Sequence, residues 1–172
     1  MSVYVAFYKG RPRPGASLRE RVKYLFDGAI RLITRSPYSH CELAIPDTTR
    51  PGVYFCVSAS VRDGGVRGKF MALPGDRWDL LPAIDPEYLR NPEHYDRALR
   101  TLPAETVSYW LRHKQGHRYD WAGVLRFVFP FLRQSDQRWF CSEFVATVLG
   151  MDNPAQQSPQ SIYQYLYGVS TK

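Results

Sequence analysis

Residues 38–45 read YSHCELAI, and residues 138–150, much later in the chain, read RWFCSEFVATVLG. In the first stretch apolar residues alternate with His40 and Glu42, which is the period of a β-strand with one polar face. In the second stretch Cys141 stands at the head of a short apolar segment that closes on a glycine, as helices often do. The two stretches predict a strand that carries a histidine and a helix that begins at a cysteine.

The rest of the chain supplies the strands and helices of one α+β domain. The strands are predicted at residues 2–8, 39–45, 53–60, 66–73 and 77–81, the last four as an antiparallel meander. The helices are predicted at residues 17–36, with Ser17 as the N-cap, and at 103–113, 119–129, 141–149 and 158–167. We therefore expect a single domain over residues 1–172, with a strand and helix at 1–37, the strands of the candidate site at 38–81 and a helical part with the cysteine helix at 103–167.

Charge and composition narrow the classes of partner. The formal net charge is +7 and aromatic residues make up 15% of the chain. The basic residues are scattered, so the charge permits an acidic polymer as partner without predicting specific nucleic-acid binding. The N-terminal residues do not resemble a signal peptide and no apolar segment is long enough to cross a bilayer, so we expect cytoplasmic synthesis and no transmembrane segment.

The three cysteines have no CxxC spacing, which argues against a disulfide framework. Strand alternation puts Cys41 and Cys56 on opposite faces, so a disulfide between them is not expected. Cys141 differs, because a thiol at a helix N-terminus lies near unpaired backbone N–H groups and the positive end of the helix dipole. Both effects lower the pKa of a thiol and make it a nucleophile. The alternative interpretation is a buried cysteine that fills space in the core.

A histidine on the polar face of its strand can take a proton from such a thiol. Glu42 lies two residues after His40, so it shares that face and is placed to steady the imidazole. Ser58, on the neighbouring strand, is a second candidate for the same task. In the alternative interpretation, His40 and Glu42 are ordinary surface residues.

Four segments together resemble the circularly permuted branch of the NlpC/P60 superfamily of papain-like thiol hydrolases, which includes YiiX-like hydrolases and proteins of phage and prophage origin. The segments are YSHCELAI, VYFCVSASVRDGGVRGK, GHRYDWAGVL and RWFCSEFVATVLG. The histidine strand comes before the cysteine helix, the reverse of the usual order in the superfamily. The resemblance implies a papain-like fold, in which an antiparallel sheet packs against helices that include the cysteine-bearing one.

The resemblance also implies roles for individual residues. Cys141 corresponds to the nucleophile, His40 to the general base and then acid, and Tyr119 to a tyrosine that lines the cleft near the oxyanion. The third polar residue of the family falls near Ser58, which is not a histidine, an asparagine or a carboxylate. Either Glu42 takes that place, or Ser58 orients the imidazole weakly, or the site works as a dyad.

The expected activity is hydrolysis of an amide bond through an acyl-enzyme, most simply in peptidoglycan-type peptides, since the resemblance implies them and the net charge suits an acidic polymer. Arg62 and Arg67, just past the strand at 53–60, are candidates for binding an anionic group of the substrate. Without a signal peptide, the protein would reach a cell wall by lysis, by injection or as part of a virion.

Three other functions are compatible with the sequence. A lipid acyltransferase or thioesterase would use the same cysteine and histidine, with the aromatic residues of 121–131 lining an apolar groove. Residues 40–42 match the H-x-E half of a zinc deaminase signature, but the P-C-x-x-C half is missing, so we expect neither a metal nor a cofactor. A phage-like relative could also be a structural or binding protein without catalytic activity, because function does not follow from fold.

Overall fold

The computed structural model describes residues 2–12, 15, 18–90, 101–127, 129, 131, 135 and 137–170. The strands are β1 (Tyr4–Tyr8), β2 (His40–Pro46), β3 (Val53–Ser60), β4 (Gly65–Ala72), β5 (Trp78–Pro82), β6 (Arg118–Tyr119) and β7 (Arg138–Trp139). The helices are α1 (Leu18–Thr34), α2 (Pro86–Arg90), α3 (Ala104–Lys114), α4 (Trp121–Leu125), α5 (Cys141–Val148) and α6 (Pro159–Ser170), with a 3₁₀ turn, η3, at Pro154–Gln156. The expected N-cap Ser17 lies outside the described residues.

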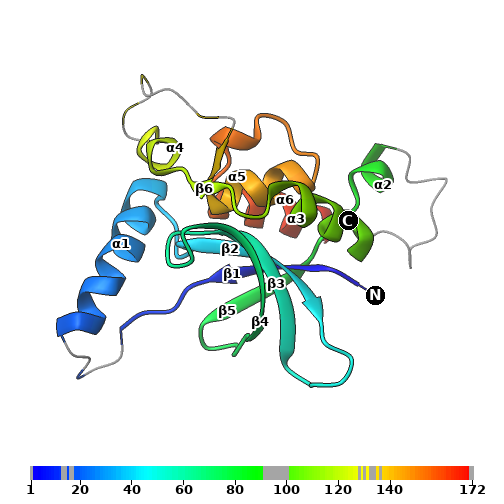
Figure 1. The fold of residues 1–172 in the computed structure, drawn as a ribbon, viewed down its shortest axis with the longest axis horizontal. Coiled ribbons are helices and arrows are strands. Elements are labelled where there is room, and N and C mark those ends of the chain that lie inside the picture. Colours follow the sequence, from blue (N-terminus) through cyan, green and yellow to red (C-terminus); the bar gives the residue numbers. More distant parts are fainter. Residues whose placement is uncertain are drawn as a thin grey trace.

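All seven strands form one curled sheet in the order β5-β1-β2-β3-β4-β6-β7 (Figure 1). The α+β class and the packing of the sheet against helices are as predicted from the sequence. Every pair is antiparallel except β6 with β7, which run parallel and therefore depart from the expected all-antiparallel sheet.

The position of β5 corrects the predicted meander, because this strand does not pair with β4. It crosses to the other edge of the sheet and pairs with β1, in a register that runs from Tyr4↔Pro82 to Tyr8↔Trp78. β1 is apolar on both faces, which is typical of a central strand whose two faces are both covered. Alternation within residues 77–81 predicted the strand itself but carried no information about its neighbour.

The sequence also predicted one helix over residues 119–129, and the structure shows a shorter one. Tyr119 belongs to β6, and α4 begins at Trp121 and ends at Leu125. The backbone of this segment adds to the edge of the β3–β4 hairpin, since the N–H of Val66 donates to the carbonyl of His117 (2.9 Å) and the N–H of Tyr119 donates to the carbonyl of Gly64 (3.0 Å). Strand pairing therefore overrides helix propensity at the start of the segment.

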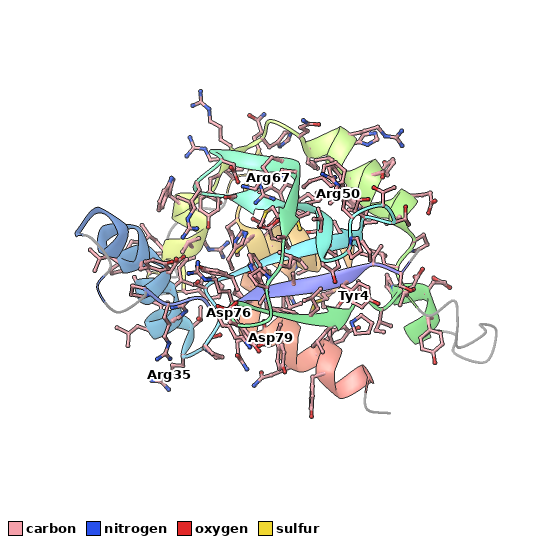
Figure 2. The ribbon with its side chains drawn as sticks, turned by 90° about the horizontal axis from the view of Figure 1, so that it is seen from below. Tyr4, Arg35, Arg50, Arg67, Asp76 and Asp79 are labelled. Atoms are coloured by element: carbon pink, nitrogen blue, oxygen red, sulfur yellow. The ribbon has the colours of Figure 1, made fainter. Side chains whose placement is uncertain are left out.

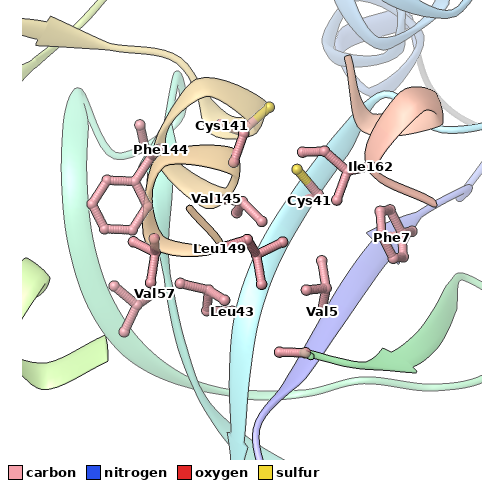
Figure 3. Packing of buried hydrophobic residues seen from close by; sticks show 14 of the residues in the cluster. Val5, Phe7, Cys41, Leu43, Val57, Cys141, Phe144, Val145, Leu149 and Ile162 are labelled. Carbon is pink, nitrogen blue, oxygen red and sulfur yellow. The ribbon is translucent and has the colours of Figure 1, made fainter. Parts of the chain in front are cut away.

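The two faces of the sheet have different neighbours. One face packs against α3, α5 and α6, and side chains from β1, β2 and β3 form the main core there. Figure 3 shows Cys41 and Leu43 of β2 pointing into this core, where Val145 and Leu149 also lie. The other face carries a smaller apolar cluster around Trp78 and the polar side chains of β2 and β4.

Candidate thiol site

α5 places Cys141 over the end of the sheet at which β2 begins. The helix packs on β2 and β3, and Cys141, Phe144, Val145 and Val148 are all buried in the core between them. This is the face predicted from helical spacing. Glu143 accepts a hydrogen bond from the N–H of Phe140 (3.4 Å), which anchors the residue before the cysteine.

His40 is the first residue of β2, and its side chain projects from the face opposite α5, as does that of Glu42. The ladder between β2 and β3 extends only as far as Leu43↔Val57, so β2 is free of β3 at its histidine end. There Cys141 lies close enough to the His40 imidazole for each group to shift the pKa of the other. The two residues of the opening stretches therefore meet in space.

Glu42 is the side chain that holds the imidazole. Its Oε1 lies 2.9 Å from Nε2 of His40, and its own side chain is almost completely buried. Ser58, the other sequence candidate, instead donates to the carbonyl oxygen of Cys41 at 2.8 Å. The Ser58 hydroxyl thus satisfies backbone where the β2–β3 ladder has ended.

The charges of these groups stabilise one another. Burial by itself lowers the pKa of His40, but attraction to the Cys141 sulfur and hydrogen bonds to Cys141 and Glu42 raise that pKa to about 9. Burial by itself raises the pKa of Glu42, but hydrogen bonds from His40 and Arg67 lower it to about 2. The arrangement favours an imidazolium held by a carboxylate.

Cys141 has a low thiol pKa for reasons that involve Cys41. The neighbouring Cys41 thiol makes the largest contribution that lowers the pKa of Cys141 well below its ordinary value, and burial opposes it. The charge and hydrogen bond of His40 and the backbone of Cys41 lower that pKa further. Sequence reasoning missed Cys41, although alternation had already placed it on the apolar face that meets the cysteine helix.

A cavity of about 610 Å³ opens beside His40 on the face of the sheet away from α5. Its walls include His40, Glu42, Arg62, Arg67, Tyr119 and Trp121, so it brings together most of the predicted site residues. Cys141 lines a second, narrow hollow of about 20 Å³, which shares Ile30 and Tyr119 with the large cavity. Tyr119 therefore lies between the thiol and the cavity, and burial raises the pKa of its hydroxyl well above the ordinary value.

The two predicted anion-binding arginines differ in their surroundings. Arg62 is more than half exposed at the cavity wall, and it donates to Asp27 at 2.9 Å. Arg67 is largely buried and bonded to both Glu42 and Asp63. Asp27, from α1, was not singled out in the sequence, because nothing in a helical pattern marks which carboxylate faces a cavity.

The remaining features of the described residues concern metals, disulfides and membranes. All three cysteines are free. No group of three or more His, Cys, Asp or Glu side chains is placed to hold a metal ion in the part of the chain that the structure describes. None of the helices within those described ranges combines the length and apolar character needed to cross a bilayer.

Comparison of the chain with models of known protein families, with curated proteins and with solved structures returns no match.

Proposed function

We propose that this protein is a thiol hydrolase that cleaves an amide bond through an acyl-enzyme, and that its α+β fold is a circularly permuted papain-like one of the NlpC/P60 kind. The observation that carries the proposal is that Cys141, at the start of α5, lies near enough to His40 for their charges to stabilise each other, while the imidazole is held by the buried Glu42. A nucleophile, a base within reach and a group that orients the base are the parts that such a reaction needs.

In the proposed reaction the Cys141 thiolate attacks the carbonyl carbon of the substrate. The developing oxyanion is bound by the backbone N–H of Cys141, in the first turn of α5, and by the hydroxyl of Tyr119. The His40 imidazolium gives its proton to the departing amine, which leaves a thioester on Cys141. His40 then takes a proton from water, which attacks the thioester, releases the acid and returns the thiolate.

The cavity supports a peptide as the substrate class. A volume of about 610 Å³ accommodates several residues of an extended chain, and the walls combine aromatic and charged side chains. Arg62 presents an exposed guanidinium at the wall, and we propose that it binds a carboxylate of the substrate, as in a peptidoglycan-type peptide. Arg67 has different partners, because its donors are bonded to Glu42 and Asp63.

A second candidate function is acyl transfer or thioester hydrolysis on a lipid. Trp121 lines the cavity and is about half exposed, and Phe131 is 79% exposed. Such rings suit an acyl chain, and the same thiolate would form the acyl-enzyme. Release of an acid and an amine from a peptide amide would support the first function. Cleavage of a lipid ester or thioester would support the second.

The test of the thiol site needs no substrate. We would follow alkylation of each cysteine by iodoacetamide between pH 4 and 10 and assign the products by peptide mass spectrometry. Cys141 is expected to react below pH 7, because its pKa is lowered, while Cys41 and Cys56 serve as internal controls with raised pKa values. In His40→Ala the midpoint for Cys141 is expected to rise by about 1–3 pH units, since the partner charge is lost.

His113→Ala is the matched control, because this histidine is exposed on α3 and contacts the carbonyl oxygen of Tyr109 rather than the site. It should leave the Cys141 midpoint where it is. A Cys141 midpoint of an ordinary thiol, indifferent to His40, would contradict the proposed function and favour a structural or binding protein.

A further inference from the structure

Arg67 lies on β4, in register with Ser58 of β3, and its side chain is on the same face as His40 and Glu42. Figure 2 labels it in a view from below the sheet of Figure 1. The side chain is only 13% exposed. The hydrogen-bond partners of Arg67 therefore decide whether its guanidinium is available to bind a substrate.

The guanidinium of Arg67 is hydrogen-bonded to Glu42 through both of its terminal nitrogens. One terminal nitrogen donates to Oε2 and the other to Oε1, each at 2.8 Å, which is the bidentate fork that arginine forms with a carboxylate. The remaining Nε donates to Oδ2 of Asp63 at 2.7 Å. With these donors engaged, little of Arg67 is left for an anionic substrate.

Asp63 connects this arginine to the turn between β3 and β4. Its carboxylate also accepts two hydrogen bonds from Nζ of Lys69, at 2.8 and 3.0 Å. The chain of contacts thus runs from Lys69 through Asp63, Arg67 and Glu42 to His40. Each link is an ion pair or a charged hydrogen bond, and the central ones are buried.

Glu42 depends on this support because its side chain is almost completely buried. A buried carboxylate that lacks a cation takes up a proton or turns toward water, and either change withdraws the acceptor from the imidazole. Oε1 of Glu42 meets both Arg67 and His40, so the fork also fixes the plane in which the carboxylate faces the ring. A lysine would supply the charge without fixing the plane.

We propose that Arg67 is a positioning residue of the thiol site, which keeps Glu42 ionised and oriented so that Glu42 can hold His40 toward Cys141. The inference rests on the proposed function and reassigns Arg67 from substrate binding. Arg62 keeps the substrate-binding role, so the two arginines of one cavity wall are expected to act in different ways.

A pair of reagents that differ in charge separates these roles. Iodoacetamide is neutral and iodoacetate is anionic, and both alkylate Cys141. In Arg67→Ala the rate at a pH below the Cys141 midpoint is expected to fall about tenfold with both reagents, which corresponds to a rise of one unit in the thiol pKa. In Arg62→Ala the rate with iodoacetamide should stay unchanged and only the rate with iodoacetate should fall.

A conservative variant and a chemical rescue distinguish loss of the proposed positioning role from a loss of folding. Arg67→Lys should lose less, about threefold, because the charge remains without the fork. Guanidinium ion at low, non-denaturing concentration should restore the rate of Arg67→Ala and leave the wild type unaffected. Arg50→Ala removes an exposed cation that pairs with Asp47 in the β2–β3 turn, and it should have no effect.

Two results would overturn the inference. One is an Arg67→Ala rate that falls with iodoacetate alone, since this is the behaviour of an anion-binding residue. The other is a pKa of the Glu42 carboxyl, followed by carbon NMR in folded protein, that is the same in Arg67→Ala as in the wild type. Failure of the proposed function would appear differently, as an ordinary thiol titration in the wild-type protein, and the Glu42 measurement would still test Arg67.

Discussion

Cys41 lies near Cys141, the proposed nucleophile, and influences its pKa in a way that sequence motifs do not predict. Its thiol is the largest cause of the lowered pKa of Cys141, and the pKa of the Cys41 thiol is itself raised well above its ordinary value, first by burial. Cys41 therefore remains protonated and acts as a donor wherever Cys141 is a thiolate. We expect Cys41→Ala to raise the pKa of Cys141 by about one unit, because a donor to the charged form is lost.

The measurement is the alkylation midpoint of Cys141 in Cys41→Ala and Cys41→Ser. The serine hydroxyl keeps a donor, so its midpoint should lie closer to that of the wild type. Cys56→Ala is the matched control, since Cys56 belongs to the apolar cluster on the other face of the sheet. Equal midpoints in all of these proteins would show that the Cys41 thiol has no influence on the thiolate.

At the residue scale, alternation was enough to predict the faces of β2 and β3. It placed Cys41 with the helix face, and Glu42 with His40. It could not decide between Glu42 and Ser58 as the partner of the imidazole, because that depends on where the β2–β3 ladder ends. Nor could it show that Arg67 reaches Glu42, since this contact depends on the register of β4 against β3.

At the level of elements, α1 contributes to the walls of both spaces beside the site. Ile30 of α1 is buried and lines both the cavity and the narrow hollow that contains Cys141. Truncating this side chain removes wall atoms from both spaces without removing a charged group of the site. We expect Ile30→Ala to increase the alkylation rate of Cys141 several-fold for a bulky haloacetamide and to leave the midpoint pH unchanged.

The rate should change less for iodoacetamide, because a small reagent needs less room. Leu32→Ala, on the same helix but 80% exposed, is the control and should alter neither rate. Loss of a buried isoleucine also costs about 2–5 kcal/mol of stability, so the rates must be compared well below the unfolding temperature. A shifted midpoint in Ile30→Ala would mean that Ile30 also supports the residues that set the pKa of Cys141, and does not only fill space beside the thiol.

Local sequence patterns predicted the helices and strands themselves better than they predicted which elements pair with one another. The helix that begins at Cys141 and the hairpin of β3 with β4 follow from spacing and turn residues that act within a few positions. The placement of β5 beside β1 and the strand at Tyr119 follow from pairing between distant segments, which local patterns do not encode. Gly65 illustrates the point, since a side chain there would overlap the carbonyl oxygen of His117 from a different segment.

At the scale of the whole molecule, the site joins three parts of the chain that are far apart in sequence. β2 supplies His40 and Glu42, β4 supplies Arg67, and α5 supplies Cys141. The charges of these residues are stabilised only when the sheet and helix are assembled. Folding and ionisation of the site are therefore linked, and stability must depend on pH in a way that reports the site.

The direction in which each group changes stability with pH follows from the direction of its pKa shift on folding. The pKa of Glu42 falls from 4.5 to about 2 on folding, so its contribution is present above pH 4.5 and is lost as pH falls through about 2. The pKa of His40 rises from 6.5 to about 9, so its contribution is full below pH 6.5 and is lost as pH rises through about 9. The lowered pKa of Cys141 contributes stability that is full above the ordinary thiol value of 9.0 and decreases below it.

Between pH 6.5 and 9 the contributions of His40 and Cys141 cancel, because folding only moves one proton from the thiol to the imidazole. The free energy of unfolding should therefore rise from acid pH to about pH 6.5 and stay level to about pH 9, as far as these groups determine it. Cys141→Ala removes the thiol but leaves His40 supported by Glu42. Its stability should decline above pH 6.5, by up to about 1.4 kcal/mol per pH unit, until the remaining pKa of His40 is passed.

Denaturant unfolding of both proteins from pH 5 to 9 measures this difference. Cys56→Ala should keep the plateau, because Cys56 does not contribute to the pKa of His40 and its own pKa, raised by burial to about 12, lies above the window. A wild-type stability that declines above pH 6.5 as steeply as that of Cys141→Ala would mean that the thiolate and imidazolium do not form a pair in the folded protein.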